Sequence, residues 1–249
     1  MSPDVVVDVG NTRIKWGRCD GGKITEIASL APDASSSWEQ QIQTWRLHRA
    51  SLWVLTGVHP ARRDTLREWL ETRGARVHIL GQTQSLPLKV ALDRPDRVGI
   101  DRVLNAVAAL AHRPPNHPVV IVDAGSAVTV DWLDAAGTFR GGAILPGLRL
   151  MAESLHAYTA QLPLIEVRHS EPALPGADTL SAMEAGIFWT VVGGIRLIVD
   201  RLARLEPLQP ALYLTGGDAG KLSSFIERPH KVWPEMTLEG IRLSAETIP

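Results

Sequence analysis

Residues 5–12 read VVVDVGNT, and residues 119–126 read VVIVDAGS. In both stretches an apolar run of the kind that forms a buried strand leads into an Asp-x-Gly turn. A second strand-like run, a tight turn and a third strand-like run follow each turn. This internal duplication predicts two similar lobes with a cleft between them. Helical and strand-like segments alternate through the rest of each half, which indicates a mixed α/β fold.

Prolines mark the expected boundary between the lobes. The prolines of residues 114–118 stop a helix that is predicted over residues 101–111. We therefore expect one lobe over residues 1–115 and the other over residues 116–249. In the second lobe, Asp178 is expected to cap a long helix.

Composition and charge exclude several classes of protein. The net charge of −1 at pH 7 gives no indication of binding to nucleic acid or to an anionic membrane. The single cysteine, Cys19, cannot form an internal disulfide, which is typical of a reducing compartment. No signal peptide is recognised, and no apolar run is judged long enough to span a bilayer. The most apolar helical stretch, residues 186–199, contains Arg196 and is interpreted as a buried helix. We expect a cytoplasmic protein without nucleic-acid or membrane partners.

The two Asp-x-Gly turns contain the residue types that phosphate binding requires. A phosphate site needs close backbone approach, available N–H groups and a carboxylate to hold Mg²⁺, and glycine permits that approach. Asn11, Thr12 and Ser126 add amide or hydroxyl donors, and Lys15 is placed to reach a transferring phosphate. The alternative is a pair of ordinary hairpins in which each aspartate caps its own turn. Two matching copies, each after an apolar strand, favour phosphate binding.

Three more motifs accompany these turns. Residues 215–218 read TGGD, and a strand that ends in two glycines before a helix suits a nucleotide base, ribose or phosphate. Residues 99–102 read GIDR at the start of a helix. Their aspartate is explained equally well as a helix cap or as the general base of a phosphoryl transfer, and their arginine suits a substrate carboxylate. The glycines of residues 141–147 suit a loop that wraps a ligand or one that packs tightly beneath it.

In their order and spacing, these motifs resemble those of type III pantothenate kinases over essentially the whole chain. The Asp-x-Gly turns are shared with the wider actin, Hsp70 and sugar kinase group, whereas the GIDR motif narrows the resemblance to this family. The resemblance implies two lobes of the ribonuclease H-like (actin-like ATPase) fold. It also implies a kinase that converts pantothenate to 4′-phosphopantothenate with ATP and Mg²⁺, in the first step of coenzyme A biosynthesis.

The resemblance further implies roles for single residues. Asp101 would be the general base, Arg102 would lie near the pantothenate carboxylate, and Asp123 would bind a monovalent cation, K⁺ or NH₄⁺. Asp8 would lie near Mg²⁺. The pantothenate pocket would be completed across a homodimer interface. The expected ATP-binding residues, which include two glycines of the TGGD motif, are Asp8, Val9, Gly10, Asn11, Thr12, Arg13, Ile14, Lys15, Ser126, Gly216 and Gly217. The expected substrate-binding residues are Gly99, Ile100, Asp101, Arg102 and Thr179.

Two positions depart from the family pattern, and two other functions stay open. Ser126 stands where the family usually has threonine, which keeps the hydroxyl. Leu92 stands where a tyrosine usually lines the pantothenate pocket, so one polar contact to the substrate is lost. One alternative is another phosphotransferase or a phosphohydrolase of the same superfamily, because the fold does not specify the acceptor. The other is an accessory protein that binds a nucleotide without turnover.

Overall fold

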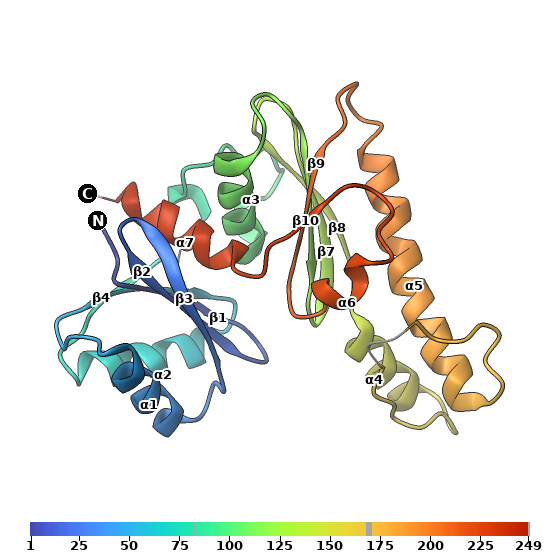
Figure 1. The fold of residues 1–249 in the computed structure, drawn as a ribbon, viewed down its shortest axis with the longest axis horizontal. Coiled ribbons are helices and arrows are strands. Elements are labelled where there is room, and N and C mark those ends of the chain that lie inside the picture. The colour runs from blue at the N-terminus through green and yellow to red at the C-terminus, as the bar shows by residue number, and fades with distance from the viewer. Residues whose placement is uncertain (82, 168–170, 249) are drawn as a thin grey trace. The chain divides into compact units, whose positions relative to one another are not determined.

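The computed structural model describes residues 1–81, 83–167 and 171–248 (Figure 1). The chain divides into two units by its internal contacts. Unit 1 comprises Met1–His112 and Glu235–Pro249, and unit 2 comprises Arg113–Pro234. Each unit is a five-stranded mixed sheet with flanking helices, so the predicted α/β fold is confirmed.

In unit 1 the first strand lies at the centre of the sheet. The strand order is β3-β2-β1-β4-β5, and β1 is antiparallel to β2 and parallel to β4. Because successive side chains along a strand point to opposite faces, the residues of β1 contribute to both faces of the sheet. The strands are β1 (Val5–Val9), β2 (Ile14–Asp20), β3 (Lys23–Leu30), β4 (Leu52–Gly57) and β5 (Arg76–Ile79).

Two pairs of helices cover the two faces of this sheet. Val5, Val7 and Val9 pack with Leu66 and Leu70 of α2 on one face. On the other face, the alternate residues of β1 and β4 pack against α3 and α7. The helical elements of unit 1 are α1 (Ser35–Trp45), α2 (Pro60–Glu71), the 3₁₀ turns η1 (Thr83–Ser85) and η2 (Pro95–Arg97), α3 (Ile100–His112) and α7 (Met236–Glu246).

The sheet of unit 2 repeats the plan of unit 1. Its order is β10-β9-β6-β7-β8, with β6 antiparallel to β7 and parallel to β9. The strand that carries the second Asp-x-Gly turn is therefore central again, as the duplication predicts. The strands are β6 (Val119–Ala124), β7 (Ala127–Leu133), β8 (Phe139–Pro146), β9 (Ala211–Thr215) and β10 (Lys231–Val232).

The long helix of unit 2 is buried along one side only. The helices are α4 (Leu148–Tyr158), α5 (Thr179–Leu202) and α6 (Ala219–Ser223). Phe188, Val191 and Ile195 of α5 pack on the sheet, which confirms the predicted buried helix. Asp178 caps α5 as predicted: its carboxylate accepts a 2.8 Å bond from the Ser181 N–H. By length and composition α5 could cross a membrane, so the prediction that no apolar run is long enough to do so is wrong. However, 44% of its most apolar window is buried in the protein.

The C-terminal helix departs from the expected lobe boundary. Residues 116–249 were assigned to the second lobe, whereas α7 packs against α3 and belongs to unit 1. The two helices approach closely at Gly240, where a Cβ atom would lie 2.0 Å from the Leu104 carbonyl oxygen. A buried 2.8 Å hydrogen bond from the Thr237 hydroxyl to the Asn105 side chain joins the same pair. Pro249 lies outside the described residues.

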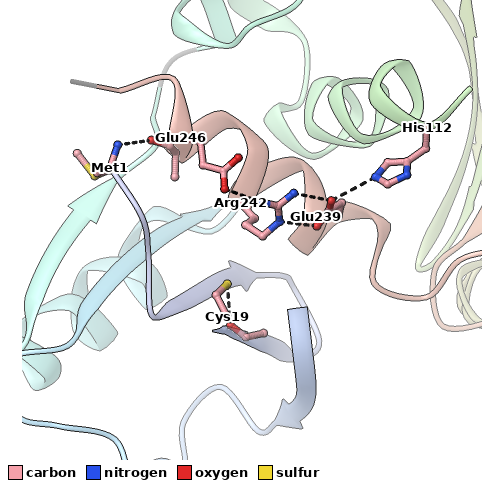
Figure 2. A network of polar contacts seen from close by, with 8 residues as sticks. Met1, Cys19, His112, Glu239, Arg242 and Glu246 are labelled. Carbon is pink, nitrogen blue, oxygen red and sulfur yellow. Dashed lines mark hydrogen bonds and ion pairs between the residues drawn. The ribbon is translucent and has the colours of Figure 1, made fainter. Parts of the chain in front are cut away.

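A partly buried ion-pair network within α7 reaches α3 at His112 (Figure 2). Arg242 donates to both oxygens of Glu239, at 2.7 and 2.8 Å, and to Glu246 at 2.6 Å. His112 of α3 lies 3.3 Å from Glu239. Burial favours the neutral form of Glu239, but its hydrogen bonds with Arg242 and His112 dominate and hold its pKa below the usual range. Burial raises the pKa of the nearby Cys19 thiol to about 12.

Candidate functional site

The first Asp-x-Gly turn joins β1 to β2 at the carboxyl end of β1. The Gly10 N–H donates to the Arg13 carbonyl at 3.1 Å, which closes the turn and leaves Asn11, Thr12 and Arg13 exposed. The neighbouring strand β4 ends at Gly57, whose φ is 150° and where a Cβ atom would lie 2.3 Å from the Val9 carbonyl oxygen. Glycine is therefore required where the two strand ends meet. The carboxyl ends of neighbouring parallel strands are the usual ligand site of open α/β sheets.

Asp8 and Lys15 lie opposite each other beside this turn. They are register partners across β1 and β2, and both are half-buried. By the alternation of β1, Asp8 belongs to the sheet face that α3 covers, opposite the face that contacts α2. Thr56 of β4 is the other register partner of Asp8, and its hydroxyl donates to the Leu80 carbonyl at 2.9 Å. A carboxylate and an ammonium group thus share the end of the strand pair.

The second Asp-x-Gly turn has the same construction in unit 2. The Gly125 N–H donates to the Ala127 carbonyl at 3.1 Å. The TGGD motif lies against this turn: the Asp218 N–H donates to the Ala124 carbonyl at 2.9 Å. At Gly216, whose φ is 95°, a Cβ atom would lie 2.5 Å from Asp123 Oδ1. The fold thus brings together two motifs that are about 90 residues apart in the sequence.

Gly142 and Gly147, of the glycine-rich segment 141–147, pack closely against β7 and this turn. Whether the segment also contacts a ligand stays a prediction. A Cβ atom at Gly147 would lie 2.3 Å from the Gly125 carbonyl oxygen, and the Gly147 N–H donates to the Ser126 carbonyl at 3.0 Å. At Gly142 a Cβ atom would lie 2.0 Å from the Val130 carbonyl oxygen. These glycines serve close packing of β8 against β7 and the turn.

Thr215 is the register partner of Asp123 in the parallel pair β6–β9, and Leu212 and Leu214 point into the core on the opposite face. Its side chain is 1% exposed, and its hydroxyl has no hydrogen-bond partner in the part of the chain that the structure describes. A buried polar atom without a partner costs about 1–3 kcal/mol, and such atoms often indicate an absent ion or water. The sequence places Thr215 in the TGGD motif but gives no sign that its hydroxyl is buried without a partner among the described residues.

The internal duplication extends to this position, and that signal was present in the sequence. Thr56-Gly57 in β4 corresponds to Thr215-Gly216 in β9, because both pairs adjoin the aspartate of an Asp-x-Gly turn. In unit 1 the Thr56 hydroxyl bonds to Leu80, which follows β5. In unit 2 the matching strand β10 has only two residues, and Thr215 makes no equivalent bond. An oxygen pair made of the Asp123 carboxylate and the Thr215 hydroxyl suits a hard cation.

The GIDR motif opens α3 in unit 1. Asp101 Oδ1 accepts a 2.9 Å bond from the Arg102 N–H, and it lies 2.5 Å from the position of a Cβ atom at Gly99. The capping contact is thus present, and the side chain is half-buried in the first turn, where the helix dipole favours a carboxylate. Ile100 packs into the core beneath it. Leu92 is half-buried in the irregular segment before η2.

Thr179 is the first residue of α5 and is exposed. Hydrogen bonds from the backbone and hydroxyl of Ser181 lower the pKa of the neighbouring Asp178. The predicted site residues therefore form four groups: those around the turn in unit 1, the GIDR motif at the start of α3, those around Asp123 in unit 2, and Thr179 at the start of α5. Within residues 1–81, 83–167 and 171–248, no cluster of three or more His, Cys, Asp or Glu side chains is arranged to hold a metal ion.

The family model and the curated relatives that match this chain all point to the same family. The type III pantothenate kinase family matches residues 5–201 of the chain. A type III pantothenate kinase of Akkermansia muciniphila is 31% identical over 241 residues, with 97% of each chain covered. That of Brevibacillus brevis is 30% identical over 253 residues, with 97% of this chain and 98% of the relative covered.

Solved structures support the fold. A conserved putative Baf family transcriptional activator from Campylobacter jejuni is similar with a TM-score of 0.63 and 20% identity, and 97% of each chain is covered. The activator of 2-hydroxyisocaproyl-CoA dehydratase from Clostridium difficile, solved with bound ADPNP, has a TM-score of 0.55 at 15% identity and covers 98% of this chain and 93% of its own. At these identities the likeness concerns the fold alone.

Proposed function

The chain belongs to the type III pantothenate kinase family, so its reaction is the phosphorylation of pantothenate in coenzyme A biosynthesis, and we propose how its residues perform it. The observation that carries the assignment of the site is the pair of matching Asp-x-Gly turns, each joined to a Thr-Gly strand end. The construction of each turn suits the binding of phosphate.

ATP binds, in this proposal, through residues 8–15 with Ser126, Gly216 and Gly217. The exposed backbone of residues 11–13 meets the phosphates, and Lys15 places a positive charge beside them. Mg²⁺ would be held by the phosphates with Asp8 as the nearby carboxylate, which suits a chain without a cluster of acidic ligands among its described residues. When bound, Mg²⁺ neutralises charge that develops on the transferring phosphate.

Pantothenate binds at Gly99, Ile100, Asp101, Arg102 and Thr179. Asp101 accepts the proton of the primary hydroxyl as the phosphoryl group transfers. Its bond from the Arg102 N–H fixes the orientation of Oδ1 in the free enzyme. The Arg102 guanidinium suits the substrate carboxylate, because it can donate two parallel hydrogen bonds. Leu92 supplies an apolar contact where relatives usually have a phenol.

A monovalent cation, K⁺ or NH₄⁺, binds at Asp123. The buried Thr215 hydroxyl supports this site, because it is an oxygen ligand on the same sheet face that has no partner within the described chain. One carboxylate and neutral oxygens suit a weakly charged ion. The change Asp123→Ala should abolish the stimulation of turnover by K⁺ relative to Na⁺. An unchanged salt response would refute the site.

A second copy of the chain packs on the exposed side of α5. The exposed residues of that side are Ala182, Gly186, Thr190, Gly193 and Leu197, four of them small. A Cβ added at Gly186 or Gly193 meets no described atom within 4 Å apart from the adjoining backbone of α5, so the fold of one chain does not require these glycines. Small residues in a row let a second helix approach closely.

The homodimer is tested with a pair of matched substitutions. Gly193→Arg places a long charged side chain on the proposed interface, and Gly220→Arg places one on the short helix α6, where an added Cβ also meets open space. Sedimentation should show a dimer for the wild type and for Gly220→Arg, and a monomer for Gly193→Arg. A dimer in all three proteins would exclude this face.

We also infer a cytoplasmic location, which suits the unpaired thiol of Cys19. Fractionation of cells that express the tagged chain tests it, and recovery with the membrane or an external fraction would contradict it.

The first experiment on the reaction measures ADP release from ATP and Mg²⁺, with and without pantothenate, in potassium and in sodium buffer. ADP release that requires pantothenate and is faster in potassium is expected. Release without pantothenate would favour a hydrolase, and tight nucleotide binding with no release would favour the accessory protein.

A further inference from the structure

Arg62 occupies a position in α2 that the helix itself does not favour. His59 is the N-cap of α2, and Arg62 follows three residues later, in the first helical turn. A positive charge there faces the positive end of the helix dipole, which is unfavourable by a few tenths of a kcal/mol or more. The contacts that Arg62 makes outside the helix are therefore of interest.

The contacts of Arg62 lead to the proposed phosphate turn. Its Nη1 donates to the backbone carbonyl of Asn11, 51 residues earlier in the sequence. Its Nη2 lies 3.5 Å from Asp33 Oδ2, but the Asp33 side chain is 76% exposed, so this ion pair contributes little. The Arg62 side chain is 27% exposed, and its bond to Asn11 lies at the surface of the unit.

This bond fixes the orientation of one peptide plane in the turn. In a trans peptide the carbonyl and the following N–H point in opposite directions. When Arg62 holds the Asn11 carbonyl toward α2, the N–H of Thr12 is directed away from α2. Because α2 covers the face of β1 opposite to Asp8, that N–H is directed to the side of Asp8 and Lys15.

We propose that Arg62 is a positioning residue for ATP: it holds the Asn11–Thr12 peptide in the orientation that presents its N–H to a phosphate. The proposal rests on the assignment of residues 8–15 to ATP binding. It concerns nucleotide affinity and not the chemistry of the acceptor, since Arg62 contacts the turn from the side away from Lys15. Arg62 acts through the backbone and is not a catalytic residue.

The test compares Arg62→Gln with Arg63→Gln. Arg63 is its neighbour in α2, carries the same charge, and pairs locally with Asp64 at 3.2 Å. The dissociation constant of a non-hydrolysable ATP analogue with Mg²⁺ is measured by calorimetry at about 50 and 500 mM KCl. The kcat, the KM for each substrate and the melting temperature are measured for all three proteins.

Arg62→Gln is expected to weaken analogue binding and raise the KM for ATP by about tenfold, as the loss of one hydrogen bond to a charged group implies. Its kcat, KM for pantothenate and melting temperature should match those of Arg63→Gln, and the tenfold ratio should persist at high salt. Unchanged affinity would overturn the proposal. So would a ratio that vanishes at high salt, which indicates long-range charge attraction, or an equal loss in Arg63→Gln.

The outcome separates this inference from the proposed reaction. If the wild type turns over pantothenate and Arg62→Gln binds the analogue normally, the kinase stands and the positioning role fails. If no pantothenate turnover occurs but the analogue binds and Arg62→Gln weakens it, the positioning role stands and the reaction fails. If the wild type does not bind the analogue, both fail.

Discussion

Replacing Thr215 with valine should stabilise the protein when potassium is absent. The hydroxyl is 1% exposed and has no partner among the described residues, so the folded state bears its desolvation cost of about 1–3 kcal/mol. Valine has the same branched shape and removes the polar atom. Because 1 kcal/mol shifts the melting temperature by about 2–4 °C in a chain of this size, Thr215→Val should melt about 2–12 °C higher.

Thr56→Val is the matched control, because Thr56 is the equivalent residue of the other unit. Its hydroxyl donates to the Leu80 carbonyl at 2.9 Å, and the residue is also 1% exposed. The same substitution there leaves a buried carbonyl without its donor and should destabilise the protein by about 1–3 kcal/mol. One chemical change at two equivalent positions is therefore expected to have opposite signs.

The assay is thermal unfolding in choline chloride and then in increasing potassium chloride. Potassium that binds only the folded wild type should raise its melting temperature, by an amount equivalent to about 2.7 kcal/mol at a hundredfold excess over the dissociation constant. Thr215→Val should respond less, and Thr56→Val should respond as the wild type does. If Thr215→Val melts lower in choline, the hydroxyl has a partner in the folded protein. An undiminished response to potassium would show that Thr215 is not a ligand.

Three further predictions concern other groups. Asp101→Asn should lower kcat by about two to four powers of ten, the usual contribution of a general base, and near-normal turnover would reject that role. Glu239→Gln should cost about 3 kcal/mol in urea unfolding at pH 7, since it breaks the buried pair with Arg242. The pKa of Glu239 is depressed, so its charge stabilises the folded protein above the ordinary pKa of 4.5, and this stability is lost as the pH falls below that value. The free energy of unfolding of Glu239→Gln should lack this decrease at acid pH. Because burial raises the pKa of Cys19 to about 12, Ellman's reagent at pH 8 should react with Cys19 much more slowly than with glutathione, and fast labelling of the native protein would contradict the buried geometry.

The sequence predicted those parts of the fold that depend on local pattern. Each apolar run before an Asp-x-Gly turn became a central strand, and Asp178 capped the long helix because its side chain needs only the next helical turn. The place of α7 was not predictable in this way. Its amphipathic pattern shows that it covers a core but not which core, and its partners Leu104 and Asn105 are about 130 residues away.

The candidate site was predictable to a similar depth. Glycines that a turn needs stand out in the sequence, but the contact of Gly216 with Asp123 is visible only in the structure. The Thr-Gly pairs at the ends of β4 and β9 could have been matched by the duplication. The sequence could not show whether the hydroxyl of each threonine has a hydrogen-bond partner, because that depends on the next strand of the sheet. That strand is β5, with four residues, in unit 1, and β10, with two, in unit 2.

The two Asp-x-Gly turns differ in the contacts that support them, and this difference indicates different roles. In unit 1 the Thr56 hydroxyl donates to the Leu80 carbonyl, and the Arg62 guanidinium of α2 donates to the Asn11 carbonyl of the turn. In unit 2 the equivalent threonine keeps an unused oxygen beside Asp123. If both turns bound only phosphate, we would expect the same supporting contacts around each turn. The different contacts are explained if the first turn is preorganised by the protein for the anionic phosphates, whereas the second depends on a bound cation to complete its polar contacts.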